Sequence, residues 1–230
     1  MRRTFVESQD GLILLGAGPV GRANFSAARA LASRVIAADG GARRALALGV
    51  MPEAVIGDLD SLDSATRAAL PEGSVHRIAE QDSTDFDKTL RHIAAPFVIG
   101  LGFWGARMDH GLAALNVLAR HPDRRCVLMG GREVCFLCPP ELDLALRPGT
   151  RVSLFPLGPV EGESEGLEWP IGGLKFAPDG RVGTSNRAPT GRVRLRFTAP
   201  RMLVMLPAGA LEAAVRALAP GAVPPAALGG

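Results

Sequence analysis

The sequence predicts an α/β fold in which a parallel sheet flanked by helices is followed by a smaller all-β part, built as a sandwich or barrel. Two observations predict this order. Over roughly the first 130 residues, short apolar runs alternate with helical patterns, which is typical of a parallel sheet with helices on its faces. From about residue 133 the pattern changes to short alternating segments broken by glycine and proline. We therefore expect domains at residues 1–132 and 133–220, and a disordered tail at 221–230.

Apolar runs and the amphipathic stretches between them locate the individual elements. The predicted strands of the first domain cover residues 12–15, 34–38, 54–56, 97–101 and 126–129. Its predicted helices cover residues 21–33, 42–48, 64–70, 85–94 and 109–120. In the second domain, strands are expected over residues 151–155, 166–169, 174–177, 181–184, 192–198 and 202–206, with a hairpin turn at residues 178–180. Ligands of such sheets collect beyond the carboxyl ends of the strands, so the loops that follow strands are where we expect chemistry.

Composition excludes several classes of function. The 26 basic and 23 acidic side chains leave a net charge of +3, so a purely electrostatic grip on nucleic acid or on a membrane is not expected. The chain has no Tyr, and neither of its lysines, Lys88 and Lys175, stands in the Gly-Lys-Ser/Thr pattern of a Walker phosphate loop. The N-terminus lacks the apolar core of a signal peptide, and the longest apolar run, residues 97–104, is too short to span a bilayer. We expect a cytoplasmic protein.

The three cysteines, Cys126, Cys135 and Cys138, include one C-x-x-C pair. No second pair completes a zinc site, and two prolines follow where the helix of a thioredoxin-like redox motif would begin. We therefore expect buried strand thiols.

Carboxylates gather where the predicted strands end. These six acids, on four loops, are Asp39, Asp58, Asp60, Asp82, Asp85 and Asp109. Because loops at one edge of a parallel sheet converge, several of these acids should lie so close together that they cannot all stay ionised unless a cation is shared. Oxygen ligands without a His/Cys cluster favour Mg²⁺. The alternative is that the acids are helix N-caps, an interpretation that suits Asp82 better than the Asp58-Leu-Asp60 pair.

Cationic side chains are interleaved with these acids. Lys88 lies three residues after Asp85, on the same face of the predicted helix, where it forms either a surface ion pair or a phosphate contact. Arg107 stands in a glycine-containing loop, from which a guanidinium can grip phosphate oxygens in a bidentate way. Metal-holding acids with Lys and Arg are the electrostatic equipment for transfer of a phosphoryl or pyrophosphoryl group.

A competing motif favours a different function. Residues 16–21, Gly-Ala-Gly-Pro-Val-Gly, match G-x-G-x-x-G between a strand and a helix, and Asp39 ends the next strand, as in a dinucleotide site of an NAD-dependent oxidoreductase. That function explains none of the other acids, because hydride transfer needs no carboxylate-bound metal. Pro19 also removes a backbone donor from the motif. The same glycines could simply form a tight turn.

Five short blocks resemble, in order, those of the thiamine pyrophosphokinases. The blocks are Ala38-Asp39-Gly40-Gly41-Ala42, Gly57-Asp58-Leu59-Asp60-Ser61, residues 81–88 (QDSTDFDK), residues 105–110 (GARMDH) and Thr184-Ser185-Asn186, and the resemblance runs from about Asp39 to Leu206. It implies a Rossmann-like α/β domain at residues 1–132 that binds ATP and Mg²⁺, a β-rich thiamine-binding domain at 133–220, and a homodimer. It also implies transfer of the β,γ-pyrophosphate of ATP to the hydroxyl of thiamine, with release of AMP. Ala106 departs from the glycine that is common in the family.

The resemblance assigns roles to particular positions. It implies that Asp39, Asp58, Asp60 and Asp85 surround the metal and that Asp58, Asp60, Asp85, Lys88, Arg107 and Asp109 carry catalysis. It implies nucleotide contacts from Asp39, Gln81, Asp82, Lys88 and Arg107, and thiamine contacts from Trp169, Ser185 and Asn186. Trp169 suits the thiazolium cation of thiamine because an indole face attracts a cation; the alternative is a core residue. A catalytically silent nucleotide sensor stays open as a further alternative, although no acid of the pattern is missing.

Overall fold

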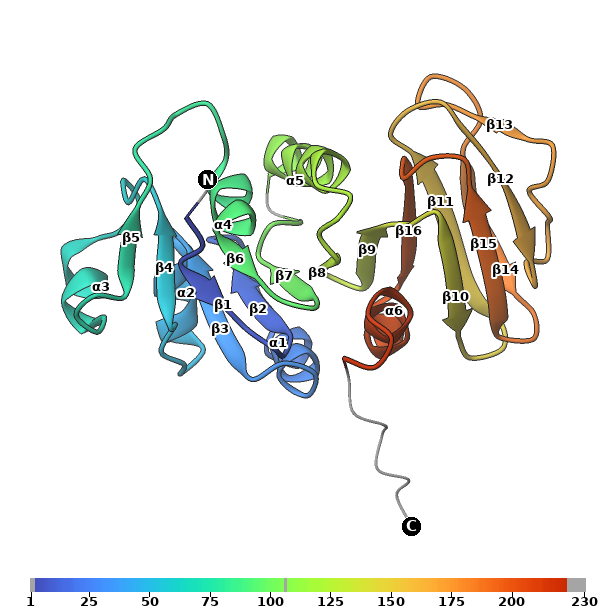
Figure 1. Ribbon diagram of the computed structural model, residues 1–230. Helices are drawn as coiled ribbons and strands as arrows, with labels where there is room; N and C mark the ends of the chain where they lie inside the picture. The colour runs from blue at the N-terminus through green and yellow to red at the C-terminus, as the bar shows by residue number, and fades with distance from the viewer. Residues whose placement is uncertain (1–2, 106, 223–230) are drawn as a thin grey trace, which may run out of the picture.

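The structure, a computed structural model, describes residues 3–105 and 107–222 and is built on one long mixed sheet. Figure 1 shows this sheet running through both halves of the molecule, in the strand order β14-β11-β16-β9-β8-β7-β2-β3-β4-β5. Its strands are β2 (Leu12–Leu15), β3 (Arg34–Ala38), β4 (Ala54–Gly57), β5 (Val75–Arg77), β7 (Val98–Leu101), β8 (Cys126–Gly130), β9 (Glu133–Leu137), β11 (Thr150–Pro156), β14 (Gly183–Ala188) and β16 (Met202–Pro207).

The N-terminal half of the sheet is parallel, as predicted. Strand β2 pairs with β3 on one side and with β7 on the other, and the parallel pairing continues outward to β5 and to β8. The chain therefore fills one side of β2 first and then crosses to the other. The point between β2 and β7 is a topological switch, where α/β sheets form a crevice beyond their carboxyl ends.

Helices cover both faces of the parallel half. They are α1 (Arg22–Arg29), α2 (Gly41–Ala47), α3 (Ser64–Ala69), α4 (Asp85–His92) and α5 (Met108–Arg120). The alternation of side chains along β2 separates the two faces: Ile13 joins the core that contains α1, whereas Leu14 joins the core that contains Leu90 of α4. A short parallel pair, β1 (Val6–Glu7) with β6 (Ile93–Ala94), lies beside the end of α4.

The C-terminal half is a sandwich that continues the same sheet. A second sheet, in the order β10-β15-β12-β13, is formed by β10 (Glu141–Ala145), β12 (Val160–Glu165), β13 (Lys175–Phe176) and β15 (Arg192–Phe197). Val193 and Leu195 of this sheet share one core with Val152 and Val204 of the long sheet, so the two sheets pack face to face. A short 3-10 turn, η1 (Ala208–Ala210), leads into α6 (Leu211–Leu218), which packs against β10 and β8.

Three local expectations were wrong. Residues 93–94 form strand β6 instead of ending the helix, because the β-branched Ile93 takes an extended backbone and pairs with Val6. Residues 166–169 are not a strand: Gly166 has φ +79° and lies so close to the carbonyl of Arg192 that the chain turns away there. The C-terminal part is not all-β, because α6 closes it with buried residues at helical spacing.

A turn after Ala177 is confirmed, since the amide of Gly180 donates to the Ala177 carbonyl at 3.0 Å. The expected hairpin is wrong, because β13 pairs with β12 and β14 pairs with β11. The boundary at 132/133 stays a prediction; β8 and β9 pair across it through a two-residue turn. Most of the tail expected at 221–230 lies outside the described residues. Within the described parts of the chain, no helix is long and apolar enough to cross a membrane.

Candidate active site

The loop after β4 brings two of the predicted acids to the edge of the sheet. Asp58 and Asp60 follow Gly57 directly, and the residue between them, Leu59, takes a positive φ of 69°. This turn lets the amide of Asp60 donate to Asp58 Oδ1 at 3.3 Å. A Cβ on Gly57 would lie 2.8 Å from Asp39 Cβ and 3.2 Å from Asp85 Oδ1. Only glycine permits that approach, so Gly57 is what lets acids from three elements converge.

Asp39 lies at the end of β3 and is 1% exposed. Its backbone takes a left-handed φ of 42°, and one of its oxygens, Oδ2, accepts a hydrogen bond from the Ser61 amide at 3.2 Å. Its other oxygen, Oδ1, is buried and has no partner among the described residues. Burial raises the pKa of Asp39 to about 6; the Ser61 amide opposes this shift, and the charges of Asp85 and Asp58 add to it. A buried carboxylate with an unpartnered oxygen calls for a ligand.

Lys88 joins the start of α4 to the loop after β4. It is 1% exposed, and its Nζ lies 2.5 Å from Asp58 Oδ2 and 3.4 Å from Asp85 Oδ1. The hydrogen bond from Lys88 lowers the pKa of Asp58. Burial raises the pKa of Asp85 despite the charge of Lys88 beside it. Although burial opposes it, the contacts with both acids raise the pKa of Lys88, so the ammonium stays charged.

Three of the four predicted metal ligands lie within reach of one ion. Asp39, Asp58 and Asp60 each offer a carboxylate oxygen, and these oxygens all lie within 4.8 Å of one another. Asp85 lies beside this trio, near Gly57, and is not part of it. Three oxygen donors with an unpartnered buried atom among them fit a hard divalent cation such as Mg²⁺.

A cavity of about 570 Å³ opens beside the acids at the switch point. Its walls come from the turn after β2, the ends of β3 and β4, the start of α4 and the segment that joins β7 to α5. Asp58, Asp85, Lys88 and Arg107 line it, which confirms that the structure gathers these predicted residues around one space. Its size is that of a small-molecule site.

Other predicted residues lie at the rim or outside the cavity. Asp109 forms a 2.6 Å ion pair with Arg107; both side chains are about two-thirds exposed, and only Arg107 lines the cavity. Gln81 and Asp82 are exposed in the segment before α4 and do not line it. Their roles toward a nucleotide stay predictions.

The first three residues of the glycine motif, Gly16, Ala17 and Gly18, line the same cavity. The sequence pattern did not predict this position. The amide of Gly16 donates to the Leu101 carbonyl at 2.8 Å, and that of Gly18 to the Gly102 carbonyl at 3.0 Å. Both backbone donors are therefore used within the protein, and Asp39 belongs to the acid cluster. This arrangement gives no support to a dinucleotide site. The repeated glycines instead let two loops pack closely, because a Cβ on Gly18 would lie 2.5 Å from Gly102 O.

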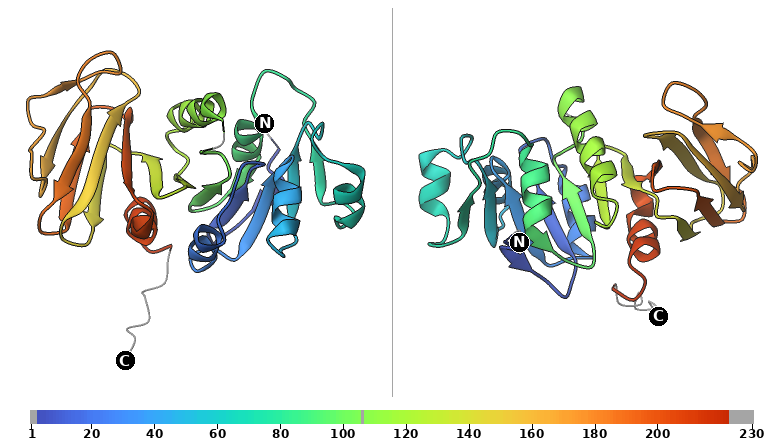
Figure 2. Two further views of the ribbon diagram at one scale, coloured as in Figure 1. Left: turned by 180° about the vertical axis from the view of Figure 1, so that it is seen from behind. Right: turned by 45° about the horizontal axis from the view of Figure 1, so that its top comes forward.

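The predicted thiamine residues cluster in the C-terminal sandwich. Trp169 is 54% exposed, and Asn186 holds its backbone: Oδ1 accepts from the Trp169 amide at 3.2 Å, and Nδ2 donates to the Trp169 carbonyl at 2.7 Å. Ser185, with φ 64°, donates its amide to Ser153 Oγ at 3.0 Å. Figures 1 and 2 show β12, β13 and β14, which carry or flank these residues, at the end of the molecule away from β4 and α4. The structure does not bring this cluster to the acids.

The cysteines are buried thiols, as expected. Cys126 and Cys135 are buried in β8 and β9, and burial raises the pKa of each thiol to about 12. Cys138 is buried directly after β9, and burial raises its pKa as well. The C-x-x-C pattern of Cys135 and Cys138 therefore reflects side chains that pack in the protein core.

A switch-point cavity lined by acids, a buried lysine and an arginine is typical of α/β proteins that bind phosphorylated ligands. The comparison with protein families makes this class specific. The model for "Thiamin pyrophosphokinase, catalytic domain" matches residues 27–128, a range that contains the acid cluster and Lys88. Residues 27–128 are thus similar to the catalytic domain of thiamine pyrophosphokinases.

Relatives and solved structures that carry the name thiamine pyrophosphokinase are also similar to the chain. The chain is 28% identical over 154 residues to thiamine pyrophosphokinase 1 of Arabidopsis thaliana, an alignment that covers 59% of this chain and 58% of the relative. It is 26% identical over 163 residues to thiamine pyrophosphokinase 1 of Oryza sativa subsp. japonica, covering 63% and 62%. The chain thus spans less than two-thirds of the length of these relatives.

Solved structures show the fold over nearly the whole chain. The yeast thiamin pyrophosphokinase superposes with a TM-score of 0.72 at 17% identity, covering 91% of this chain and 93% of that one. The enzyme from Geobacillus thermodenitrificans superposes with a TM-score of 0.70 at 20% identity, covering 86% and 96%. The α/β part and the β-rich part therefore occur together in these neighbours.

Proposed function

We propose that the chain is a Mg²⁺-dependent thiamine pyrophosphokinase, which transfers the β,γ-pyrophosphate of ATP to the hydroxyl of thiamine. The observation that carries this proposal is the convergence of Asp39, Asp58 and Asp60 beside the buried Lys88, within the matched catalytic region. Curated relatives named thiamine pyrophosphokinase support the same reaction.

The acids at the sheet edge are suited to hold the metal. Asp39, Asp58 and Asp60 supply the oxygens, and the unpartnered oxygen of Asp39 is the observation that favours a cation there. When bound, Mg²⁺ neutralises polyphosphate charge and orients the phosphate oxygens. Lys88 and Arg107 line the adjoining cavity, where they bind phosphate oxygens and offset charge on the transferred and leaving groups.

The proposed reaction is a single displacement at the β-phosphorus of ATP. The hydroxyl oxygen of thiamine attacks the β-phosphorus, a new O–P bond forms, and the bond from that phosphorus to the oxygen shared with the α-phosphate breaks, so that AMP leaves. The hydroxyl proton passes to a carboxylate or to water. Of the two candidate acceptors, Asp85 lines the cavity and its pKa is raised by burial, whereas Asp109 is exposed and paired with Arg107. We therefore assign the proton to Asp85.

Thiamine recognition is proposed for the exposed Trp169, which offers an indole face to the thiazolium cation. Because the elements around Trp169 lie at the end of the molecule away from the acids, we propose a homodimer in which the sandwich of one copy serves the cavity of the other. Light scattering on the purified protein should give twice the chain mass of 24.0 kDa. A strictly monomeric, active protein would contradict this arrangement.

The decisive experiment is product analysis after incubation with thiamine, ATP and Mg²⁺. We expect AMP and thiamine diphosphate in equal amounts, with none formed in EDTA. Formation of ADP would reject pyrophosphoryl transfer, and ATP binding without turnover would instead make the protein a nucleotide sensor. A titration with NAD(H) in EDTA tests the oxidoreductase alternative, which nothing in the described site favours.

A further inference from the structure

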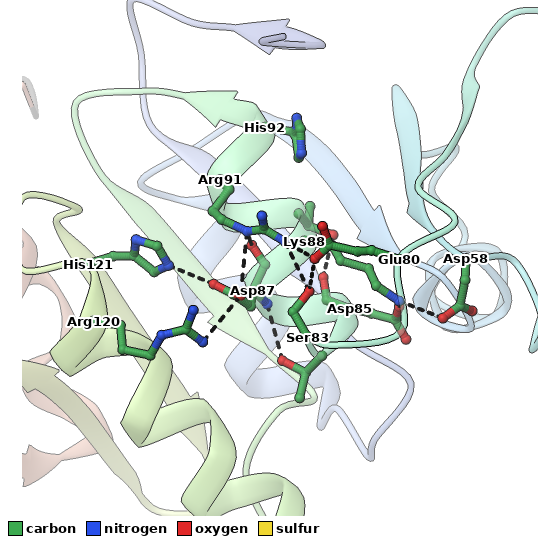
Figure 3. A network of polar contacts seen from close by, with 12 residues as sticks. Asp58, Glu80, Ser83, Asp85, Asp87, Lys88, Arg91, His92, Arg120 and His121 are labelled. Carbon is green, nitrogen blue, oxygen red and sulfur yellow. Dashed lines mark hydrogen bonds and ion pairs between the residues drawn. The ribbon is translucent and has the colours of Figure 1, made fainter. Parts of the chain in front are cut away.

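A second buried carboxylate lies on α4, on the opposite side from the phosphate cavity. Asp87 is 1% exposed and is surrounded by cationic side chains. His121 Nε2 lies 2.6 Å from its Oδ1, and Arg120 Nη1 and Arg91 Nε each lie 3.4 Å from its Oδ2. Figure 3 shows these groups converging from α4 and from the end of α5. Asp87 therefore ties the two helices together and holds the Nε group of Arg91, which also donates to the Asp87 backbone carbonyl at 3.3 Å.

The Nη2 group of Arg91 reaches the segment that precedes α4. Its Nη2 pairs with Glu80 Oε1 and donates to Ser83 Oγ at 2.9 Å, and Ser83 Oγ also donates to Glu80. These bonds lower the pKa of Glu80, the Ser83 contact most and Arg91 next, so Glu80 stays ionised. A planar guanidinium with separate donors on Nε and Nη2 can bridge helix and loop in a fixed geometry, which the single ammonium of a lysine does not provide.

The segment held by Arg91 forms one wall of the phosphate cavity. Ser83 and Thr84 line that cavity, and Thr84 caps α4 by accepting from the Asp87 amide at 3.3 Å. Asp85 and Lys88 follow in the first turn of the helix. The helix itself is fastened separately, because the buried side chains of Phe86 and Leu90 share one core with Ile56 of β4. Loss of Arg91 should therefore release the wall and leave the helix in place.

We propose that Arg91 is a positioning residue: anchored by Asp87, it holds the segment 80–84, of which Ser83 and Thr84 line the cavity, and so pre-forms the site for a magnesium–polyphosphate ligand. The nature of the ligand rests on the proposed function, whereas the coupling between Arg91 and the wall does not. A wall that is already ordered binds more tightly, because the cost of ordering it is not incurred on binding.

Limited proteolysis of the ligand-free protein tests the coupling. In Arg91→Gln, endoproteinase Asp-N should cleave within residues 81–84 at least about tenfold faster, while cleavage elsewhere in the chain keeps its rate. Arg34→Gln is the matched control, since Arg34 donates to Glu53 Oε2 at 2.8 Å on a partly exposed edge of β3 away from the cavity. It should leave the 81–84 rates unchanged. Unchanged rates in Arg91→Gln itself would overturn the proposal.

Binding and kinetics test the consequence. Calorimetry with ATP and Mg²⁺, without thiamine, should show an affinity about tenfold weaker in Arg91→Gln, and the KM for ATP should rise similarly while kcat stays within about threefold. Arg91→Lys should recover only part of the affinity, and Glu80→Gln should weaken binding less, with the double variant no worse than Arg91→Gln alone. A fall in kcat at unchanged affinity would refute the positioning role. Suppose instead that ATP binds normally and the Arg91 variants behave as expected, but no thiamine diphosphate forms. That result would contradict the proposed function and leave the positioning role of Arg91 standing.

Discussion

Asp39 and Asp87 are both 1% exposed, yet they have opposite surroundings. Asp87 faces two arginines and a histidine, so its charge is compensated within the chain. Asp39 faces other carboxylates, receives one backbone hydrogen bond, and keeps a buried oxygen without a partner among the described residues. Burial alone therefore does not distinguish a structural acid from a functional one. The two acids are distinguished by their neighbours. A buried carboxylate that no cationic side chain of the protein contacts indicates a ligand.

Backbone strain follows the same division. Asp39 and Leu59, both at the acid cluster, take positive φ angles that non-glycine residues rarely adopt. Asp87 lies in a regular helix with its amide capped by Thr84. Strain and uncompensated charge at one place indicate a site that is stabilised only when its ligand is bound.

The largest expected effect is on the compensated acid. Asp87→Asn keeps the shape of the side chain and leaves Arg91 and Arg120 without their anion, so we expect the free energy of unfolding to fall by about 3 kcal/mol. Urea denaturation measures it. Asp143→Asn, which removes the exposed partner of Arg194, is the control and should change stability by less than about 0.5 kcal/mol. A loss as small as the control's would mean that Asp87 is not an anchor.

Changing the proposed metal ligands should affect turnover and leave the fold intact. Asp58→Asn and Asp60→Asn should each lower the rate of thiamine diphosphate formation by at least about 100-fold at saturating Mg²⁺. Thermal unfolding in EDTA serves as the check that folding is preserved. Near-normal rates would refute the metal assignment.

Asp39→Asn should have the opposite sign to Asp87→Asn when no metal is present. Because the pKa of Asp39 is raised to about 6 in the folded state, its charged form costs stability as the pH rises through 6. The neutral variant should therefore be more stable by about 1–2 kcal/mol at pH 8 in EDTA, with the gain vanishing below about pH 4. Added Mg²⁺ should raise the Tm of the wild type more than that of the variant. Destabilisation at pH 8 would contradict this assignment.

The smallest expected effect concerns the sandwich. Trp169→Ala should raise the KM for thiamine about fivefold while changing kcat and the KM for ATP less than twofold, because it removes a cation–π contact and leaves the phosphate cavity untouched. Initial-rate kinetics with each substrate varied in turn measures this split. An unchanged KM for thiamine would make Trp169 a packing residue.

Much of the acid edge could be predicted from the sequence, because strand alternation and the position of acids after strands are local properties. Strands β2 and β3 match their predicted bounds, and the convergence of Asp39, Asp58 and Asp60 follows from parallel pairing. The sequence did not separate Asp85 from Asp87. They lie two residues apart in one helical turn, and only the packing of α5 against α4 gives Asp87 its cations.

Long-range pairing explains the remaining errors. The change of pattern near residue 133 indicates a new type of structure, but not that β9 pairs back onto β8 and continues the sheet. The crowding of Gly16 and Gly18 against Gly102 also depends on β2 and β7 being neighbours, which no local pattern states. Both features arise from contacts between residues far apart in the chain.

The tight turn between β8 and β9 has a practical consequence for dissecting this protein. Because β9 covers the whole length of β8, a fragment that stops near residue 128 would leave a buried apolar strand as an unprotected edge. Such a fragment should associate or precipitate, so the phosphate site is best studied in the intact chain.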